Sequence, residues 1–162
     1  MKRVIDKANE MNRLYGNDLD QIAESLGLAV IYEKMTGSFR EVYFQEASSI
    51  VIREDLHRRE KRELIAHAIG HHLLHAGNHL SMQNRIYSFG NYHEKQANVF
   101  AAVLLMPSDD LQKVMRARPR IDEIADNFHV TDELVRLRLL VLANFEKVNK
   151  GAAAKSEMSN YC

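Results

Sequence analysis

The sequence has no tryptophan, two prolines and a single cysteine, Cys162, at its last position. One cysteine cannot form a disulfide within the chain, so we expect a packed core and a reducing compartment. Long hydrophobic runs are also lacking. The longest, residues 99–106, has eight residues, whereas about 20 are needed to span a bilayer. No basic segment followed by an apolar one opens the chain, so we expect no secretory signal and predict a cytoplasmic protein without membrane contact.

An excess of charge of either sign is lacking as well. Lys and Arg total 22, as do Asp and Glu, in 162 residues. The overall charge therefore favours neither a nucleic acid nor an anionic membrane as partner. Hydrophobic residues make up 46% and charged residues 27%, which is typical of a globular protein. From the length we predict a single domain over residues 1–150, followed by a flexible tail over residues 151–162.

Hydrophobic periodicity predicts a mostly helical α+β fold. Apolar residues recurring at three and four positions predict two helices within residues 1–27. Segments rich in β-branched and aromatic residues predict a small three-stranded antiparallel sheet over residues 28–54. Two long helices are expected within residues 55–107, and further helices over residues 108–150. Residues 78–91 lack periodicity and contain a glycine and several Asn and Ser, so we expect a loop there.

Histidine is the unusual part of the composition, because five of the eight lie between His67 and His79. His67 and His71 are four residues apart on a predicted helix, so they lie about 6 Å apart along its axis and on one face. Such a pair can bind one zinc ion, although packed histidines can have the same spacing. His75 lies about 12 Å along the axis from His67, so we expect it outside the ligand set. His72 points to another face, and we expect it in the core or on the surface.

A zinc enzyme usually has three protein ligands and leaves one position to water. The nearest downstream candidates are His93 and Glu94, at the start of a predicted helix that ends before Pro107. Glu94 has a simpler interpretation too, because Asn91 is a suitable N-cap and Glu94 then completes a capping box. From these residues alone, both interpretations stay open.

Two segments together resemble the ImmA/IrrE family of zinc metallo-endopeptidases. They are LIAHAIGHHLLH, residues 64–75, and HEKQANVFAAVLLMP, residues 93–107. In that family a helical H-E-x-x-H run is followed, some twenty to thirty residues later, by a helix of the form E-x-x-A-N-x-F-A-A-x-L-L-M-P. The second segment contains every fixed position of that helix. The order of helices, small sheet, metal-binding helices and C-terminal helices is also similar, so the resemblance covers about residues 1–145.

The resemblance implies a zincin-like domain in which His67, His71 and Glu94 bind Zn²⁺. It also implies a peptide hydrolase whose partner is a helix-turn-helix repressor, often of a mobile element or a stress response. Two histidines and a carboxylate suit zinc better than calcium or magnesium, which favour oxygen ligands. The oligomeric state is left open.

The sequence departs from the family pattern at Ala68, where the family has the glutamate that takes a proton from the zinc-bound water. Alanine cannot accept a proton, and losing a general base typically costs about 10² to 10⁴ in rate. Three explanations remain: an inactivating substitution, a natural variant that no longer hydrolyses, or a natural variant with another base. His93, Tyr87 and Tyr92 are candidates for that base. Glu63, one turn before the first histidine of the pair, is expected on the solvated face.

The predicted helices within residues 121–142 resemble a helix-turn-helix, with Arg136 and Arg138 on the second helix. Asp132 and Glu133 at its start would repel phosphates, so we predict packing against the metal-binding part and no direct nucleic-acid contact. We therefore predict a zinc endopeptidase acting on a repressor and impaired in hydrolysis. The alternatives are a metal-containing protein that sequesters the repressor without cleaving it, and a DNA-binding regulator.

Overall fold

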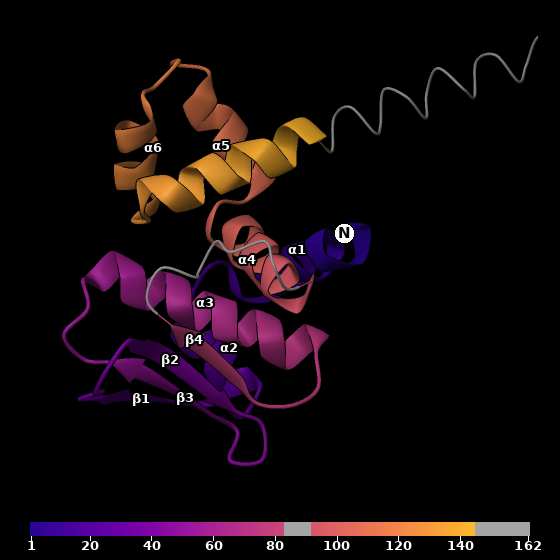
Figure 1. Cartoon of the computed structure of the whole chain (residues 1–162). Helices are drawn as coiled ribbons and strands as arrows, with labels where there is room; N and C mark the ends of the chain where they lie inside the picture. The colour runs from indigo at the N-terminus through magenta and orange to yellow at the C-terminus, as the bar shows by residue number, and fades with distance from the viewer. Residues whose placement is uncertain (83–91, 145–162) are drawn as a thin grey trace, which may run out of the picture.

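The computed structural model describes residues 1–82 and 92–144 (Figure 1). The elements are, in order, α1 (Lys2–Tyr15), α2 (Leu19–Ser25), β1 (Ala29–Glu33), β2 (Phe39–Phe44), β3 (Ser49–Arg53), α3 (Arg58–Leu74), β4 (His79–Met82), α4 (Tyr92–Leu105), α5 (Ser108–Met115), α6 (Ile121–Phe128) and a last helix, described over 132–144. This arrangement confirms the predicted mostly helical α+β class. The predicted tail, residues 151–162, lies outside the described ranges, and the domain boundaries stay a prediction.

The sheet differs from the prediction in two respects. It has four strands in the order β1-β3-β2-β4, and β4 lies in the segment expected to be a loop, of which residues 83–91 are outside the described ranges. Strand β2 is antiparallel to both β3 and β4, but β1 pairs with β3 in parallel. Strand patterns identify extended segments, whereas the neighbour of each strand depends on how the connections run. The prediction of three antiparallel strands was therefore wrong in this detail.

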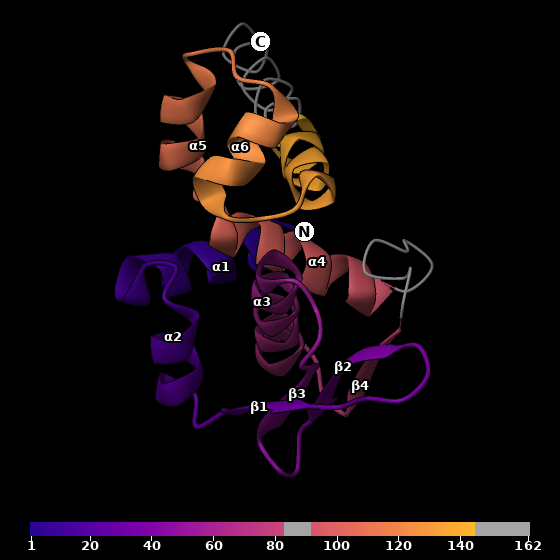
Figure 2. The same ribbon diagram turned by 90° about the vertical axis from the view of Figure 1, so that its left-hand side faces the viewer.

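Helix α3 is the centre of the fold. It lies across one face of the sheet, α4 packs on its opposite side, and α1 packs against α4 (Figure 2). All residues from Ala97 to Leu105 of α4 are buried. A helix that is covered on all sides has no polar face, which explains the apolar run over residues 99–106. No helix in the described ranges has both the length and the hydrophobicity needed to cross a membrane.

The C-terminal helices lie over α4 in both views (Figures 1 and 2). Two buried polar side chains, Glu63 and Arg138, connect them to the rest of the fold. Glu63 of α3 is only 3% exposed and accepts hydrogen bonds from the backbone N–H and the hydroxyl of Thr131. Arg138 of the last helix is 2% exposed and donates to the carbonyl of Met106 and the hydroxyl of Ser108, both at 2.8 Å. The prediction that Glu63 is solvated was wrong, because the last helix covers it. The side chain of Arg138 points into the protein and is not available to a DNA phosphate in this arrangement.

Candidate metal centre

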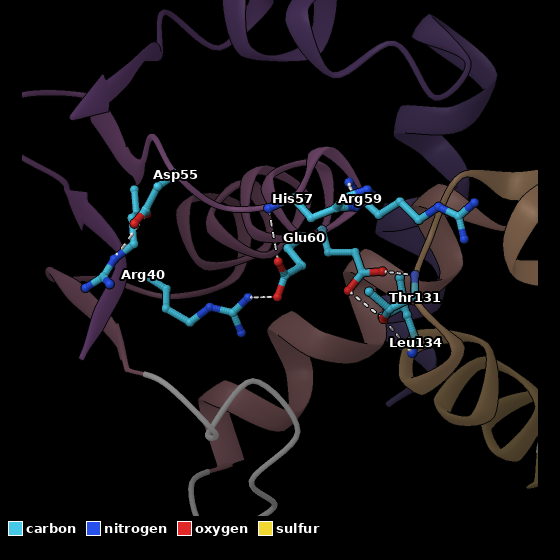
Figure 3. Close-up of polar contacts among 9 residues, drawn as sticks. Arg40, Asp55, His57, Arg59, Glu60, Thr131 and Leu134 are labelled. Atoms are coloured by element: carbon cyan, nitrogen blue, oxygen red, sulfur yellow. Dashed lines mark hydrogen bonds and ion pairs between the residues drawn. The ribbon is translucent and has the colours of Figure 1, made fainter. Parts of the chain in front are cut away.

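Polar contacts at the start of α3 fix this helix on the sheet (Figure 3). His57 is the N-cap: its Nδ1 accepts a hydrogen bond from the backbone N–H of Arg59, and its own N–H donates to the carboxylate of Glu60 at 3.1 Å. The same carboxylate pairs with Arg40 of β2. The cap and the ion pair therefore hold the first turn of α3 against β2, which positions the later turns over the sheet.

Two turns further along α3, the paired histidines face each other inside the protein. The Nε2 atoms of His67 and His71 are 3.0 Å apart, and the two residues are 2% and 0% exposed. Glu94, from the first turn of α4, reaches between them. One of its carboxylate oxygens lies 3.3 Å from Nε2 of His67 and the other 3.2 Å from Nε2 of His71. The structure thus brings together the three residues predicted as metal ligands, and their ligand atoms all lie within 4.8 Å of one another.

This geometry fits a divalent transition metal. Zinc binds imidazole nitrogen and carboxylate oxygen at about 2.0–2.2 Å, so neighbouring ligand atoms on a tetrahedral ion are about 3.3–3.5 Å apart. The measured separations of 3.0, 3.2 and 3.3 Å are close to that range. Two nitrogens and a carboxylate also match the preferences of zinc, since calcium and magnesium favour oxygen ligands alone. The donor set therefore suits one such ion.

The charges of two of the three residues, Glu94 and His71, also suit a metal. Burial raises the pKa of Glu94, but its hydrogen bonds with both imidazoles outweigh burial and the pKa falls below the usual range. Burial lowers the pKa of His71 to about 3. Burial also opposes protonation of His67, yet its hydrogen bond to the Glu94 carboxylate and the negative charge of Glu41 raise the pKa of His67 above its usual value. At neutral pH, Glu94 is ionised and His71 is neutral, which are the forms that bind metals.

Gly70 allows α3 and α4 to approach closely enough for this arrangement. A Cβ atom at Gly70 would lie 3.1 Å from Cδ1 of Phe100 and 3.2 Å from Cα of Ala97. These distances are shorter than ordinary packing contacts, so a larger residue would force the helices apart. Because Glu94 lies about one turn before Ala97 on α4, the close approach also sets how far its carboxylate reaches toward the histidines.

The other histidines lie around the cluster and not within it. The ring of His75 stacks on that of His93, with centroids 4.1 Å apart, and lies 5.4 Å from the ring of His71. The ring of His79, from β4, stacks on His71 with centroids 3.7 Å apart. His75 therefore lies outside the three-residue cluster, as its spacing predicted. Because the ring of His93 stacks on that of His75, the ring of His93 lies at the C-terminal end of α3.

Ala68 leaves the cluster without a carboxylate from α3. Its side chain is fully buried in the hydrophobic core. Among the candidates for a substitute base, Tyr87 lies outside the described residues and Tyr92 is 64% exposed. His93 stays a prediction in this role, because its observed neighbour is His75.

Sequence reasoning missed Glu41, which lies on β2 beneath the cluster. Glu41 is 0% exposed, and one of its carboxylate oxygens lies 4.0 Å from Nε2 of His67. Neither oxygen has a hydrogen-bond partner in the part of the chain that the structure describes. Burial raises the pKa of Glu41 to about 7, with the positive charge of His67 lowering it and the negative charge of Glu94 raising it.

A signal for Glu41 was present in the predicted strand. Side chains alternate along a strand, so Glu41 and Tyr43 point to the same side. Both face α3: Glu41 approaches His67, and the hydroxyl of Tyr43 lies 2.8 Å from Nδ1 of His72. A glutamate that shares its strand face with a buried tyrosine is unusual, and this pattern could have identified it.

The comparisons with known proteins agree with the geometry. The family model described as the IrrE N-terminal-like domain, a peptidase family, matches residues 23–140. The match begins within α2 and ends within the last helix, so it includes the sheet and the whole described cluster. It covers well over half of the chain, and the chain therefore belongs to this family. A search among curated proteins found no match.

Proposed function

We propose that this member of the IrrE N-terminal-like peptidase family binds one zinc ion through His67, His71 and Glu94 and hydrolyses peptide bonds there. The observation that carries the proposal is the convergence of two Nε2 atoms and a carboxylate at separations of 3.0 to 3.3 Å. A zinc ion held by three protein ligands lowers the pKa of water and polarises a carbonyl group. Family membership supports the same chemistry.

The residues around the cluster have distinct tasks in this proposal. His67 and His71 are fixed on one helical turn, so they lose little freedom when they bind. The carboxylate of Glu94 supplies the negative charge that partly neutralises the ion. Strand β4 is the outer strand of the sheet, and its His79 stacks on His71. An extended peptide paired along the outer edge of β4 would therefore pass the cluster.

We propose a helix-turn-helix repressor as the protein substrate, from the family resemblance, and the cytoplasm as the location, from the single cysteine. Ala68 supports weakened hydrolysis, because the helix that holds the histidines provides no proton acceptor. It equally favours a second function, in which the protein binds its partner without cleaving it. The DNA-binding alternative loses support, because Arg138 is buried and bonded to Met106 and Ser108.

The zinc content of the purified protein tests the first part of the proposal. Elemental analysis should give about one zinc per chain, and His67→Ala should remove it. His72→Ala is the matched control, because His72 neighbours His71 on the same helix but pairs with Tyr43. We expect the control to retain its zinc. Equal zinc contents in His67→Ala and the unchanged protein would contradict the proposal.

A cleavage assay separates hydrolysis from capture. The candidate substrate is a helix-turn-helix repressor, incubated with the zinc-loaded chain, with Ala68→Glu and with Ala68→Gln. If the missing base limits the rate, Ala68→Glu should increase cleavage about 10² to 10⁴-fold and Ala68→Gln should not. A stable complex without fragments in all three proteins would support the binding function instead. Circular dichroism checks that the buried position tolerates both residues.

A further inference from the structure

We infer that Glu41 supplies the proton-accepting carboxylate that Ala68 cannot provide. The inference rests on the proposed peptidase function. In it, Glu41 accepts a proton from the attacking water as the water oxygen bonds to the peptide carbonyl carbon. Glu41 then returns the proton to the amide nitrogen as the carbon–nitrogen bond breaks. The products are a carboxylic acid and an amine, and Glu41 ends in its initial state.

The first support is the environment of the carboxylate. Glu41 is 0% exposed, and both of its oxygens lack a hydrogen-bond partner within the described ranges. An ionised carboxylate buried in this way destabilises the fold unless a cation or a hydrogen-bond donor compensates for the lost water. Buried polar groups in native proteins nearly always have such partners. The cluster 4.0 Å away is the place where a cation and a water molecule would provide both.

The second support is the rigidity of its position. The backbone of Glu41 lies in the middle of the sheet, opposite Ile52 of β3 on one side and Ser81 of β4 on the other. The register of the β2–β4 pair shifts between Phe39 and Glu41, and such irregularities redirect the side chains next to them. Arg40, at the shift, pairs with Glu60 of α3. The strand therefore holds Glu41 at a fixed place under the histidines.

Distances distinguish a proton acceptor from a fourth ligand. The three atoms of the cluster are 3.0 to 3.3 Å apart, whereas the nearest oxygen of Glu41 is 4.0 Å from Nε2 of His67. A general base must lie within hydrogen-bond reach of the water and not necessarily of the ion. Glu41 therefore lies beside the ligand set, as a base requires. His93 stacks on His75 and Tyr92 is 64% exposed, so Glu41 is the best-placed group among those described.

The test compares Glu41→Gln with the unchanged protein. Glutamine keeps the size of the side chain but cannot take up a proton at neutral pH. Glu33→Gln, on the exposed strand β1, is the matched control. Chelator competition should give zinc affinities within threefold of each other for all three proteins, and their Co²⁺ forms should have the same visible spectrum. A large loss of metal affinity or a changed spectrum in Glu41→Gln would make Glu41 a ligand and overturn the inference.

The decisive probe is acetohydroxamate, whose oxygens bind zinc and whose hydroxyl donates to a neighbouring carboxylate. Zinc-loaded Glu41→Gln should bind acetohydroxamate at least about tenfold more weakly than the unchanged protein, because the charge-assisted hydrogen bond between the hydroxamate hydroxyl and the carboxylate is lost. Glu33→Gln should bind it as the unchanged protein does. Equal affinities in Glu41→Gln and the unchanged protein would overturn the inference and leave the zinc-peptidase proposal standing. Absence of zinc binding in the unchanged protein would instead overturn that proposal.

Discussion

Two junctions of α3 contain a buried glutamate, and they differ in how that glutamate is bonded. At the junction with the last helix, Glu63 is 3% exposed and accepts two hydrogen bonds from Thr131. At the junction with β2, Glu41 is 0% exposed and its oxygens accept none from the described residues. The bonded carboxylate holds two parts of the fold together. Glu41, whose carboxylate has no such hydrogen bonds, lies beside the metal-ligand cluster, where a carboxylate can accept a proton.

The comparison also separates stability from function. A protein gains stability from a buried carboxylate only when donors compensate for the lost water. Glu63 meets this condition within the fold. Glu41 meets this condition only when a metal ion and water fill the site. In the metal-free protein, its burial therefore lowers the stability of the folded state. Substitutions at the two junctions should therefore have opposite effects, as the following predictions describe.

The largest effect is expected at the cluster itself. Glu94→Gln should weaken zinc binding at least a hundredfold, because an amide oxygen replaces the charged ligand while the paired histidines remain. Chelator competition measures this change. Glu10→Gln, at a half-exposed glutamate of α1 that pairs with Lys7, is the control and should bind zinc normally. A small change in Glu94→Gln would mean that the carboxylate is not a ligand.

Removing the bonded glutamate should have the next largest effect. Glu63→Ala loses two hydrogen bonds to a charged acceptor, each worth about 1.5–3 kcal/mol, so the free energy of unfolding should fall by about 4 kcal/mol. Urea unfolding monitored by circular dichroism measures it. The zinc affinity of the folded variant should not change. If Glu63→Ala left stability intact and abolished zinc binding, the distinction between the two junctions would be wrong.

Glu41, the glutamate without hydrogen-bond partners among the described residues, should make the stability of the metal-free protein depend on pH. Its pKa is raised to about 7 from an ordinary value of 4.5, so the folded state holds a proton that the unfolded state loses. Stability is therefore greatest below pH 4.5 and falls as the pH rises toward 7, by about 3 kcal/mol at most. His67 and Glu94 face the same carboxylate: Glu94 stays ionised over this range, and the positive charge of His67 lowers the pKa of Glu41.

Glu41→Gln tests this contribution, because glutamine does not titrate in this range; the substitution also removes the charge that raises the pKa of His67. Urea unfolding in the presence of chelator should show that Glu41→Gln is more stable than the unchanged protein at pH 8. The difference should shrink toward pH 5. A difference that does not vary with pH would show that the burial of Glu41 is compensated in the folded protein.

The smallest effect is expected where the helices meet. In Gly70→Ala, the added methyl group must displace Phe100 or the backbone at Ala97 by a few tenths of an ångström, at a cost of about 1–2 kcal/mol. The shift should also move Glu94 and weaken zinc binding severalfold. Ala66→Gly, at a buried position one turn earlier, should lower stability without this loss of affinity. Unchanged zinc affinity in Gly70→Ala would show that the helix spacing does not control the cluster.

The helices and half of the site could be predicted from local patterns. The apolar run of α4 and the four-residue spacing of His67 and His71 depend only on the geometry of one helix. Glu94 required the family resemblance, because its position alone also suited a capping box. Glu63 was predicted wrongly, since the charge pattern of α3 does not reveal that the last helix covers it.

The sequence by itself determined that α3 presents two imidazoles on one face and that Ala68 removes the carboxylate expected there. Only the tertiary structure decided that Glu94 closes the cluster, that β1 runs parallel to β3 and that Glu41 lies 4.0 Å from His67. The physical reason is the range of the interactions. Helical periodicity links residues three or four positions apart, whereas strand order and the burial of a charged side chain depend on segments that are distant in the chain.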